Sequence, residues 1–185
     1  MLSKMLRSSF VVFFIFSIAN IAMASERYLL NAGDVLDISV WNEEALQKQV
    51  ALLPDGMISF PLAGEIMAQG KSVTEIQATL TEKLKEYLSE PVVTVSVVAV
   101  SGNTVNIMGK VIQPGSFVMT KNIDVMQALS LAGGLSPYAE ENNIIVIRRN
   151  GEHQQIISVH YASIKKGQDL DTNIILNSGD VIVIP

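Results

Sequence analysis

The chain of 185 residues has no cysteine, and it has only one tryptophan and two histidines. Without cysteine there is no disulfide, no thiolate nucleophile, no zinc–cysteine site and no iron–sulfur cluster. The same absence excludes a lipid carried on an N-terminal cysteine. A protein of this composition must depend on its hydrophobic core, for which valine, isoleucine and leucine are plentiful.

Positive charge is scarce as well. The sequence has 13 lysines and arginines against 18 aspartates and glutamates, which gives a net charge of −5. A surface that binds a nucleic acid needs clustered lysine or arginine to neutralise the phosphates. The sequence therefore predicts that no nucleic acid is a partner.

The first 24 residues have the three parts of a secretory signal peptide. Lys4 and Arg7 precede an apolar run at 10–19, and the small-residue site Ala22-Met23-Ala24 follows. The run is too short for a membrane-spanning helix, which needs about 20 apolar residues. We expect cleavage between Ala24 and Ser25. Residues 1–24 carry no acid, so their removal changes the net charge from −5 to −7.

Residues 25–100 show the pattern of a strand, a hairpin, a helix and a strand. Apolar residues at 36, 38 and 40 alternate with polar ones, which is typical of a half-buried strand. Pro54-Asp55-Gly56 predicts a turn between two further strands at 50–53 and 57–60. The last strand is predicted at 93–97, where valines alternate with polar residues.

The clearest single element is a helix from Ser72 to Leu88. Ser72 and Glu75 have the spacing of a capping box, in which the two side chains bind unpaired amides at the start of the helix. Apolar residues then form one stripe at spacings of three and four, at Val73, Ile76, Leu80, Leu84 and Leu88. Pro91 prevents the helix from continuing.

A small polar break at 100–103 separates a second unit, which we assign to residues 101–185. The unit begins with a predicted strand at 105–111, a type II turn at Gln113-Pro114-Gly115 and a helix from 123 to 132. Asn122 is the expected N-cap of that helix, and Gly133-Gly134 its end.

Two further signals complete this unit. Asn150-Gly151 predicts a two-residue hairpin between strands at 144–148 and 155–159. Residues 181–184 are apolar on both faces of a strand, which should therefore lie inside a sheet. The pattern of both units together indicates the α+β fold class.

A short internal repeat opens and closes the mature sequence. Residues 30–35, Leu-Asn-Ala-Gly-Asp-Val, are similar to residues 176–181, Leu-Asn-Ser-Gly-Asp-Val. Asp binds nearby amides and Gly permits a positive φ, so Gly-Asp makes a good turn into a strand. We favour this turn role over a ligand role that the two copies share.

No catalytic or metal-binding constellation is visible, so we expect neither an enzyme nor a cofactor. His153 and His160 are about 20 Å apart on a continuous strand, too far to share a metal. Four acids of the first unit could in principle supply a glycosidase pair: Asp34, Asp37, Asp55 and Glu65. Asp34 and Asp55 have turn roles, and Asp37 lies on the polar side of a strand.

Two other features could bind a sugar polymer. Trp41 could stack on a sugar ring, but its place at the end of an apolar strand favours a contact in the core or between subunits. Arg148 and Arg149 could meet an acidic polymer. Alternation sends them to opposite faces of the hairpin, and Glu152 is near enough to pair with one of them.

Taken together, the motifs resemble those of the bacterial outer-membrane polysaccharide export family. In the first unit they are Tyr28-Leu29-Leu30, Gly33-Asp34-Val35-Leu36-Asp37-Ile38 with Val40-Trp41, Pro54-Asp55-Gly56-Met57-Ile58 with Pro61-Leu62-Ala63-Gly64, and Pro91 to Val95. In the second unit they are Val105 to Val111, Pro114-Gly115-Ser116-Phe117, Ala128 to Gly134, and Leu176 to Pro185. The resemblance covers essentially the whole mature sequence.

The resemblance implies an export domain followed by one soluble-ligand-binding (SLBB) β-grasp domain. It also implies a homo-oligomeric ring in the periplasm, at the outer membrane, that conducts capsular or exopolysaccharide and contacts an inner-membrane copolymerase. The sequence has no lipidation cysteine and no amphipathic helix after its last strand. We therefore expect a separate outer-membrane β-barrel protein to complete the path.

Two other classes remain open. A monomeric periplasmic carbohydrate-binding module could share the β-grasp half of the sequence. A polysaccharide-modifying enzyme is the third choice. The sequence indicates neither which residues bind the polymer nor which polymer is bound.

Overall fold

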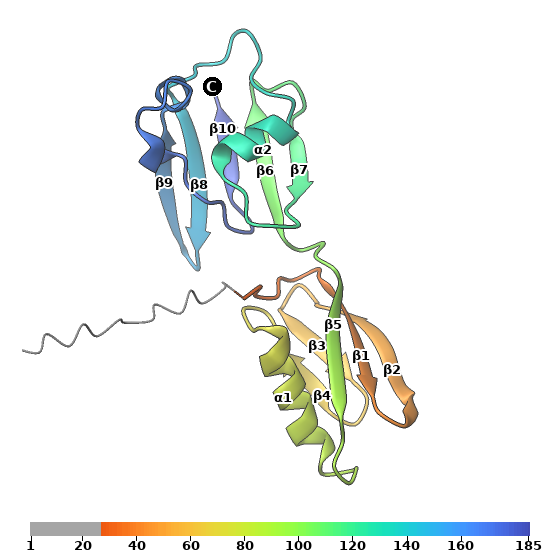
Figure 1. Cartoon of the computed structure of the whole chain (residues 1–185). Helices are drawn as coiled ribbons and strands as arrows, with labels where there is room; N and C mark the ends of the chain where they lie inside the picture. Colours follow the sequence, from red (N-terminus) through yellow and green to blue (C-terminus); the bar gives the residue numbers. More distant parts are fainter. Residues whose placement is uncertain (1–26) are drawn as a thin grey trace, which may run out of the picture.

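The structure, a computed structural model, describes residues 27–185. The expected cleavage site at Ala24 and Ser25 lies outside these residues. The fold is α+β, as predicted, and it is divided into two domains that a single connection from β5 to β6 joins (Figure 1). Each domain has a separate hydrophobic core. No helix within residues 27–185 is long and apolar enough to span a bilayer.

The first domain is built on a three-stranded antiparallel sheet of order β2-β1-β5. The bounds of these strands are Val35–Val40 for β1, Glu43–Ala51 for β2 and Val93–Ala99 for β5. A two-stranded hairpin and one helix complete the domain: β3 (Met57–Phe60), β4 (Gly64–Met67) and α1 (Val73–Leu84). The helix and the last strand follow in the predicted order. The predicted hairpin across Pro54-Asp55-Gly56 is wrong, because β2 pairs with β1 and β3 pairs with β4, so this turn connects two different sheets.

Helix α1 packs along β5 with its apolar stripe facing the core (Figure 1). The predicted capping box is present: Glu75 N–H donates to the Ser72 hydroxyl, and Ser72 N–H donates to the Glu75 carboxylate at 2.8 Å. The Ser72 hydroxyl also donates to the Glu75 carboxylate at 2.6 Å, and this bond, followed by the one from the Ser72 main chain, lowers the pKa of Glu75. The helix ends at Leu84, and Leu88 packs against the core from the turn that follows.

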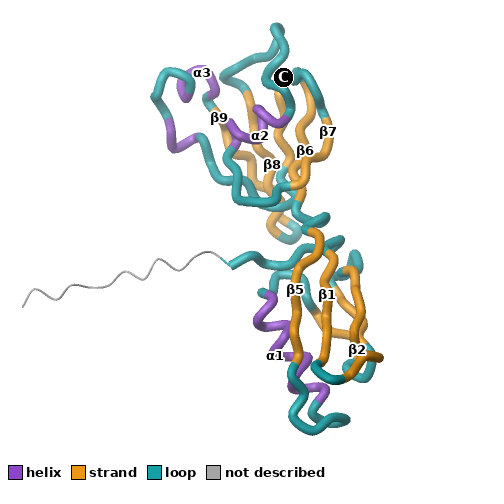
Figure 2. Tube along the Cα trace, turned by 45° about the vertical axis from the view of Figure 1, so that its right-hand side comes forward, coloured by secondary structure: helices purple, strands orange, loops and turns teal. Residues whose placement is uncertain are grey.

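The second domain contains a five-stranded mixed sheet of order β7-β6-β10-β8-β9 (Figure 1). Figure 2 shows β6, β7, β8 and β9 of this sheet together with α2. Its strands are β6 (Thr104–Gly109), β7 (Gly115–Val118), β8 (Ile144–Asn150), β9 (His153–Val159) and β10 (Val181–Ile184). Strand β10 lies in the middle, parallel to β6 and antiparallel to β8, which confirms that it lies inside a sheet.

Three short helices accompany this sheet: α2 (Val125–Leu131), α3 (Tyr161–Ile164) and the 3₁₀-helix η1 (Leu170–Thr172). One face of the sheet packs beneath α2, and every second residue of the inner strands is buried there, including Val105, Ile107, Val146 and Ile182. The alternate residues of the same strands lie on the opposite face.

Three predicted details of the second domain are wrong. The N-cap of α2 is Asp124 and not Asn122, because Asp124 and Gln127 form a capping box that binds two amides. Gly115 makes no type II turn, which would need a positive φ, since it is extended and paired with Ile107. The hairpin loop is Gly151-Glu152, because Asn150 pairs with His153 and Gly151 takes the positive φ.

The stripe of α1 gives a test of the first core. Leu80 is fully buried, so Leu80→Ala removes its transfer free energy and leaves a cavity. We expect the free energy of unfolding to fall by about 2–5 kcal/mol in a denaturant titration. Gln77→Ala, at an exposed position of the same helix, should change it by less than about 0.5 kcal/mol. A change as small as that for Leu80→Ala would mean that the stripe does not pack on the sheet.

Candidate functional site at the domain junction

The two copies of the internal repeat have the same structure. In each copy the carboxylate of the aspartate, Asp34 or Asp180, accepts the main-chain N–H of the asparagine three residues earlier at 2.8 Å. The glycine before each aspartate has a positive φ, 95° at Gly33 and 84° at Gly179. A strand begins immediately after each copy. The predicted turn role is confirmed.

Asp34 is completely buried at the junction of the two domains. Its Oδ2 accepts the Tyr28 hydroxyl at 2.6 Å and the Asn31 amide, and its Oδ1 accepts the amide of Gly102 at 3.0 Å. The first two donors belong to the same turn, whereas Gly102 belongs to the connection between β5 and β6. The carboxylate therefore fastens this connection to the first domain.

Gly102 is held from the second domain as well. Its carbonyl accepts the hydroxyl of Ser178, which lies in the second copy of the repeat, at 2.9 Å. A Cβ at Gly102 would lie 2.1 Å from the carbonyl oxygen of Ala32, so only glycine fits. The two repeat turns thus bind the N–H and the carbonyl of the same linker residue. We call this arrangement the linker clamp: Asp34, Gly102 and Ser178.

The second buried aspartate, Asp180, has a different partner. The guanidinium of Arg148 binds its carboxylate through Nε at 3.0 Å and Nη2 at 2.7 Å. This bond raises the pKa of Arg148. Arg148 therefore pairs with Asp180 and not with Glu152. Strand β8 is the neighbour of β10, and Ile147 pairs with Val181, so Arg148 lies beside the start of β10. Arg149 has the opposite orientation, as predicted, and lines a hollow with Ile147.

Burial and Asp34 together raise the pKa of Tyr28 well above its ordinary value of 10.0. Burial is the larger cause, and the hydrogen bond to Asp34 is next. An ionised phenol here would lie beside a buried carboxylate, and repulsion between like charges opposes that state. Tyr28 is thus held as a hydrogen-bond donor.

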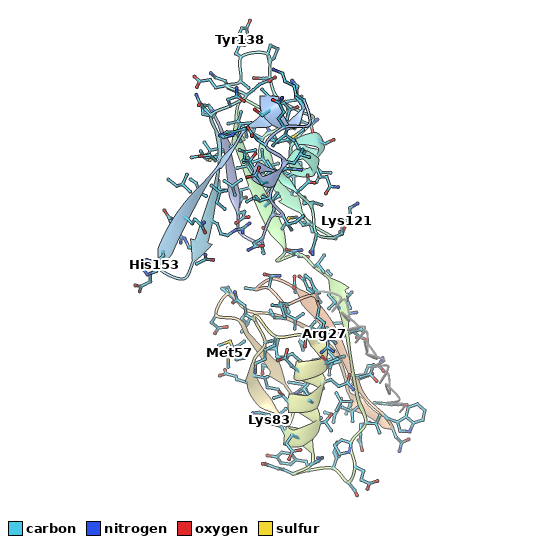
Figure 3. The ribbon with its side chains drawn as sticks, turned by 60° about the vertical axis from the view of Figure 1, so that its left-hand side comes forward. Arg27, Met57, Lys83, Lys121, Tyr138 and His153 are labelled. Carbon is cyan, nitrogen blue, oxygen red and sulfur yellow. The ribbon has the colours of Figure 1, made fainter. Side chains whose placement is uncertain are left out.

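A polar cleft of about 440 Å³ lies beside the linker clamp, between the two domains. Its lining residues come from the first repeat turn and the residues before it, from the β5–β6 connection, from the β7–α2 loop and from the second repeat turn: Arg27, Tyr28, Leu29, Asn31, Asn103, Thr120, Lys121, Asn122, Leu176, Asn177 and Ser178. Figure 3 shows Arg27 and Lys121 on the two sides of the junction, one in each domain. Amides, hydroxyls and two cations line the cleft together with Leu29 and Leu176, and no carboxylate is among its lining residues.

This lining suits a hydrated molecule rich in hydroxyl groups. Asparagine side chains both donate and accept hydrogen bonds, and hydroxyls do the same, so each can replace a water on a sugar. The cations favour acidic substituents. Sequence reasoning noticed the repeat that supplies Asn31 and Asn177 but missed Arg27, Asn103 and Lys121, because they meet only across the junction.

The acids considered for catalysis lie on different elements. Asp34 is the buried centre of the clamp, Asp37 lies on β1, and Glu65 is exposed on β4. Asp55 lies in the β2–β3 turn, where it accepts the amide of Met57. Within residues 27–185, no three His, Cys, Asp or Glu side chains are grouped to hold a metal ion.

The two histidines lie at opposite ends of a strand, as expected. His153 begins β9 and is exposed, while His160 follows the end of β9 and lies 3.3 Å from the carboxylate of Asp169. Figure 3 shows His153 at the tip of the β8–β9 hairpin.

Trp41 does not lie in the core, so that part of the prediction is wrong. The side chain is 81% exposed in the turn between β1 and β2. Leu36, Ile38 and Val40 are the inward residues of β1, so the alternation turns residue 41 outward. A contact between subunits and stacking on a sugar both remain predictions.

Comparison with known proteins assigns both domains. Residues 22–98 match the family model described as polysaccharide biosynthesis/export protein, and residues 103–184 match the SLBB domain. These two matches lie in the order that the fold shows. The chain thus contains a domain of the polysaccharide biosynthesis/export protein family, followed by one SLBB domain.

Individual relatives agree with this assignment. The chain is 27% identical over 183 residues to the EPS I polysaccharide export outer membrane protein EpsA of Ralstonia nicotianae, covering 84% of the chain and 46% of EpsA. It is 26% identical to the capsule polysaccharide export outer membrane protein CtrA of Neisseria meningitidis, with 84% and 43% covered. For the polysialic acid transport protein KpsD of Escherichia coli the identity is 26%, with 72% and 24% covered. The chain spans less than half the length of these relatives.

The buried carboxylate of the linker clamp can be tested by substitution. Asp34→Asn replaces one acceptor oxygen by a donor that faces N–H or O–H groups, so buried donors lose their partner. We expect the free energy of unfolding to fall by at least about 2 kcal/mol, measured by denaturation. Asp55→Asn is the matched control, since that exposed side chain accepts one amide and asparagine can replace it. Equal, small losses in both variants would contradict the clamp.

Tyr28 gives a test with a defined pH dependence. Its pKa is raised in the folded state, so its contribution to stability is complete below the unfolded pKa of about 10 and is lost as the pH rises towards the folded value. The unfolding midpoint should therefore fall between pH 10 and 12, and Tyr28→Phe should reduce this fall. Tyr138→Phe, at an exposed tyrosine, is the control and should leave the fall unchanged.

Proposed function

We propose that the protein is a periplasmic, ring-forming subunit of a conduit that exports capsular polysaccharide or exopolysaccharide. The polymer passes along the subunits towards the outer membrane. An inner-membrane copolymerase delivers it, and a separate outer-membrane protein completes the path. The protein has no catalytic role in this proposal.

One observation carries the proposal: an export domain and an SLBB domain match in order over almost the whole described chain. The printed names of the relatives EpsA and CtrA refer to polysaccharide export at the outer membrane. These names support the same role here.

The geometry of the junction supports a role in the passage of a polymer. The cleft is open and polar, and sites that bind small ligands tightly are instead enclosed and mostly apolar. A polar cleft exchanges bound water for sugar hydroxyls with little net gain, so it can hold a moving polymer and release it. The linker clamp keeps the two walls of the cleft in register.

The same cleft also supports a second candidate function. A monomeric carbohydrate-binding module would use the amides of Asn31, Asn103 and Asn177 to bind a soluble oligosaccharide. That module would need no ring. Native mass and oligosaccharide titration of the purified protein distinguish it from a conduit subunit.

Deletion of the gene tests the proposed function. Polymer or its lipid-linked precursor should be retained inside the outer membrane, while the glycosyltransferases remain active in extracts. The full-length chain should restore secretion. A version without residues 1–24 should fail to restore it, because the signal peptide is needed to reach the periplasm.

Two results would contradict the proposal. Normal secretion by the deletion strain would remove the export role. Hydrolysis of the polymer by the purified protein would favour the polysaccharide-modifying enzyme.

A further inference from the structure

The sheet of the second domain has an open apolar face. Six aliphatic side chains lie on the face opposite α2, in two rows across the strands: Met108, Val183 and Ile145 in one row, and Val181, Ile147 and Ile156 in the other. Met108 is 52% exposed and Ile156 66%. None of the six belongs to the hydrophobic core cluster of the domain. We call these six residues the open face.

The described chain does not cover the open face. Helix α2 lies over the other face of the sheet, as Figure 1 shows. Tyr161 of α3 lines a hollow together with residues of α2, and Asn173 accepts the amide of Met126 in α2, so these segments also lie on the α2 side. Strands that are apolar on both faces are normally buried on both. The open face therefore has the character of an interface.

A second apolar surface lies on the α2 side of the same domain. A groove of about 270 Å³ runs between β7 and α2, and its lining includes Val118, Ile123 and Leu131. Leu131, at the end of α2, is 50% exposed. On the other flank of α2, a hollow is lined in part by Gly133, Gly134 and Ser130, which leave space for an incoming side chain.

The domain thus carries two unlike apolar surfaces on opposite sides, one flat and one grooved. Such a pair is suited to a heterologous, head-to-tail contact between identical chains. Repetition of that contact gives a closed ring when the rotation closes. We infer that the open face of one copy packs on the α2 groove of the next copy, and that this contact builds the assembly. The inference rests on the ring-forming function proposed above.

The chemistry of the open face favours a second copy over a sugar or a lipid surface. The six aliphatic side chains offer no hydrogen bond to a polymer rich in hydroxyl groups. The polar residues that continue the two rows, Ser158 and Asn106, lie at opposite ends of the face. An anionic lipid surface attracts clustered lysine and arginine, whereas this chain has a net charge of −5. Arg149 lies beside Ile147 on this side of the sheet, but one cation is not a cluster. An apolar surface with a complement on the same chain fits the interior of a protein interface.

Charge substitutions on each surface test the inference. Met108→Lys with Ile156→Lys alters the open face at exposed positions, and Leu131→Lys alters the groove. Val98→Lys, at a 53% exposed position of β5 in the first domain, is the matched control. In native mass spectrometry and sedimentation of the mature protein, we expect wild type and Val98→Lys to form oligomers. Both altered proteins should be monomers with unchanged unfolding midpoints.

Mixing the two altered proteins gives the most specific result. The open-face variant keeps an intact groove, and the Leu131→Lys variant keeps an intact open face. The intact groove of the first variant can bind the intact open face of the second, and no other pair of intact surfaces remains. An equimolar mixture should therefore form one-to-one dimers and nothing larger.

Several results would overturn the inference. Wild type that stays monomeric, or an open-face variant that still forms the wild-type oligomer, would exclude this contact. Loss of assembly in the open-face variant alone would indicate face-to-face pairing. Binding of monomeric wild type to anionic lipid vesicles through Met108 and Ile156 would assign the face to a membrane. In each case, restored secretion by the wild-type gene would leave the export function standing, so the two failures are distinguishable.

Discussion

The buried carboxylate of Asp34 is the interaction on which the arrangement of this protein depends. It accepts three hydrogen bonds, two from its own turn and one from Gly102 in the connection between the domains. A buried carboxylate is costly unless donors surround it, so the three donors and the carboxylate hold one another in place. Ser178 of the second domain binds the carbonyl of the same glycine. Gly102 therefore links the side chain of Asp34 in the first domain to the second domain.

The same turn occurs twice, and its buried aspartate has different partners in the two copies. The carboxylate of Asp34 accepts hydrogen bonds from two main-chain amides and a phenol, and its hydrogen bond contributes to the raised pKa of Tyr28. Asp180 is paired with the guanidinium of Arg148, which reaches it from β8 across the sheet. The first turn therefore orients the junction, and the second fixes the start of the central strand β10 against its neighbour.

In the function that we propose, a polar surface contacts the polymer and apolar surfaces contact further copies of the chain. The cleft beside the linker clamp presents amides, hydroxyls and cations from both domains, which suits brief contacts with a hydrated polymer. The open face and the α2 groove present aliphatic side chains on opposite sides of the second domain, which suits contact with further copies. The clamp is common to both, since it fixes the cleft relative to the domain that carries the two apolar surfaces.

The sequence by itself determined the elements and the family. Alternation placed β1 and β5, and a run that is apolar on both faces placed β10. The capping box and the apolar stripe placed α1, and the ordered motifs indicated an export domain followed by a β-grasp domain. Local periodicity reports only which face of an element is apolar, and it carries no information on what meets that face. Tertiary structure alone decided that two turns from opposite ends of the chain grip Gly102, that Arg148 pairs with Asp180, and that Trp41 points to solvent. Those features depend on residues that are distant in sequence. They exist only once both sheets have formed and the connection between them has a fixed conformation.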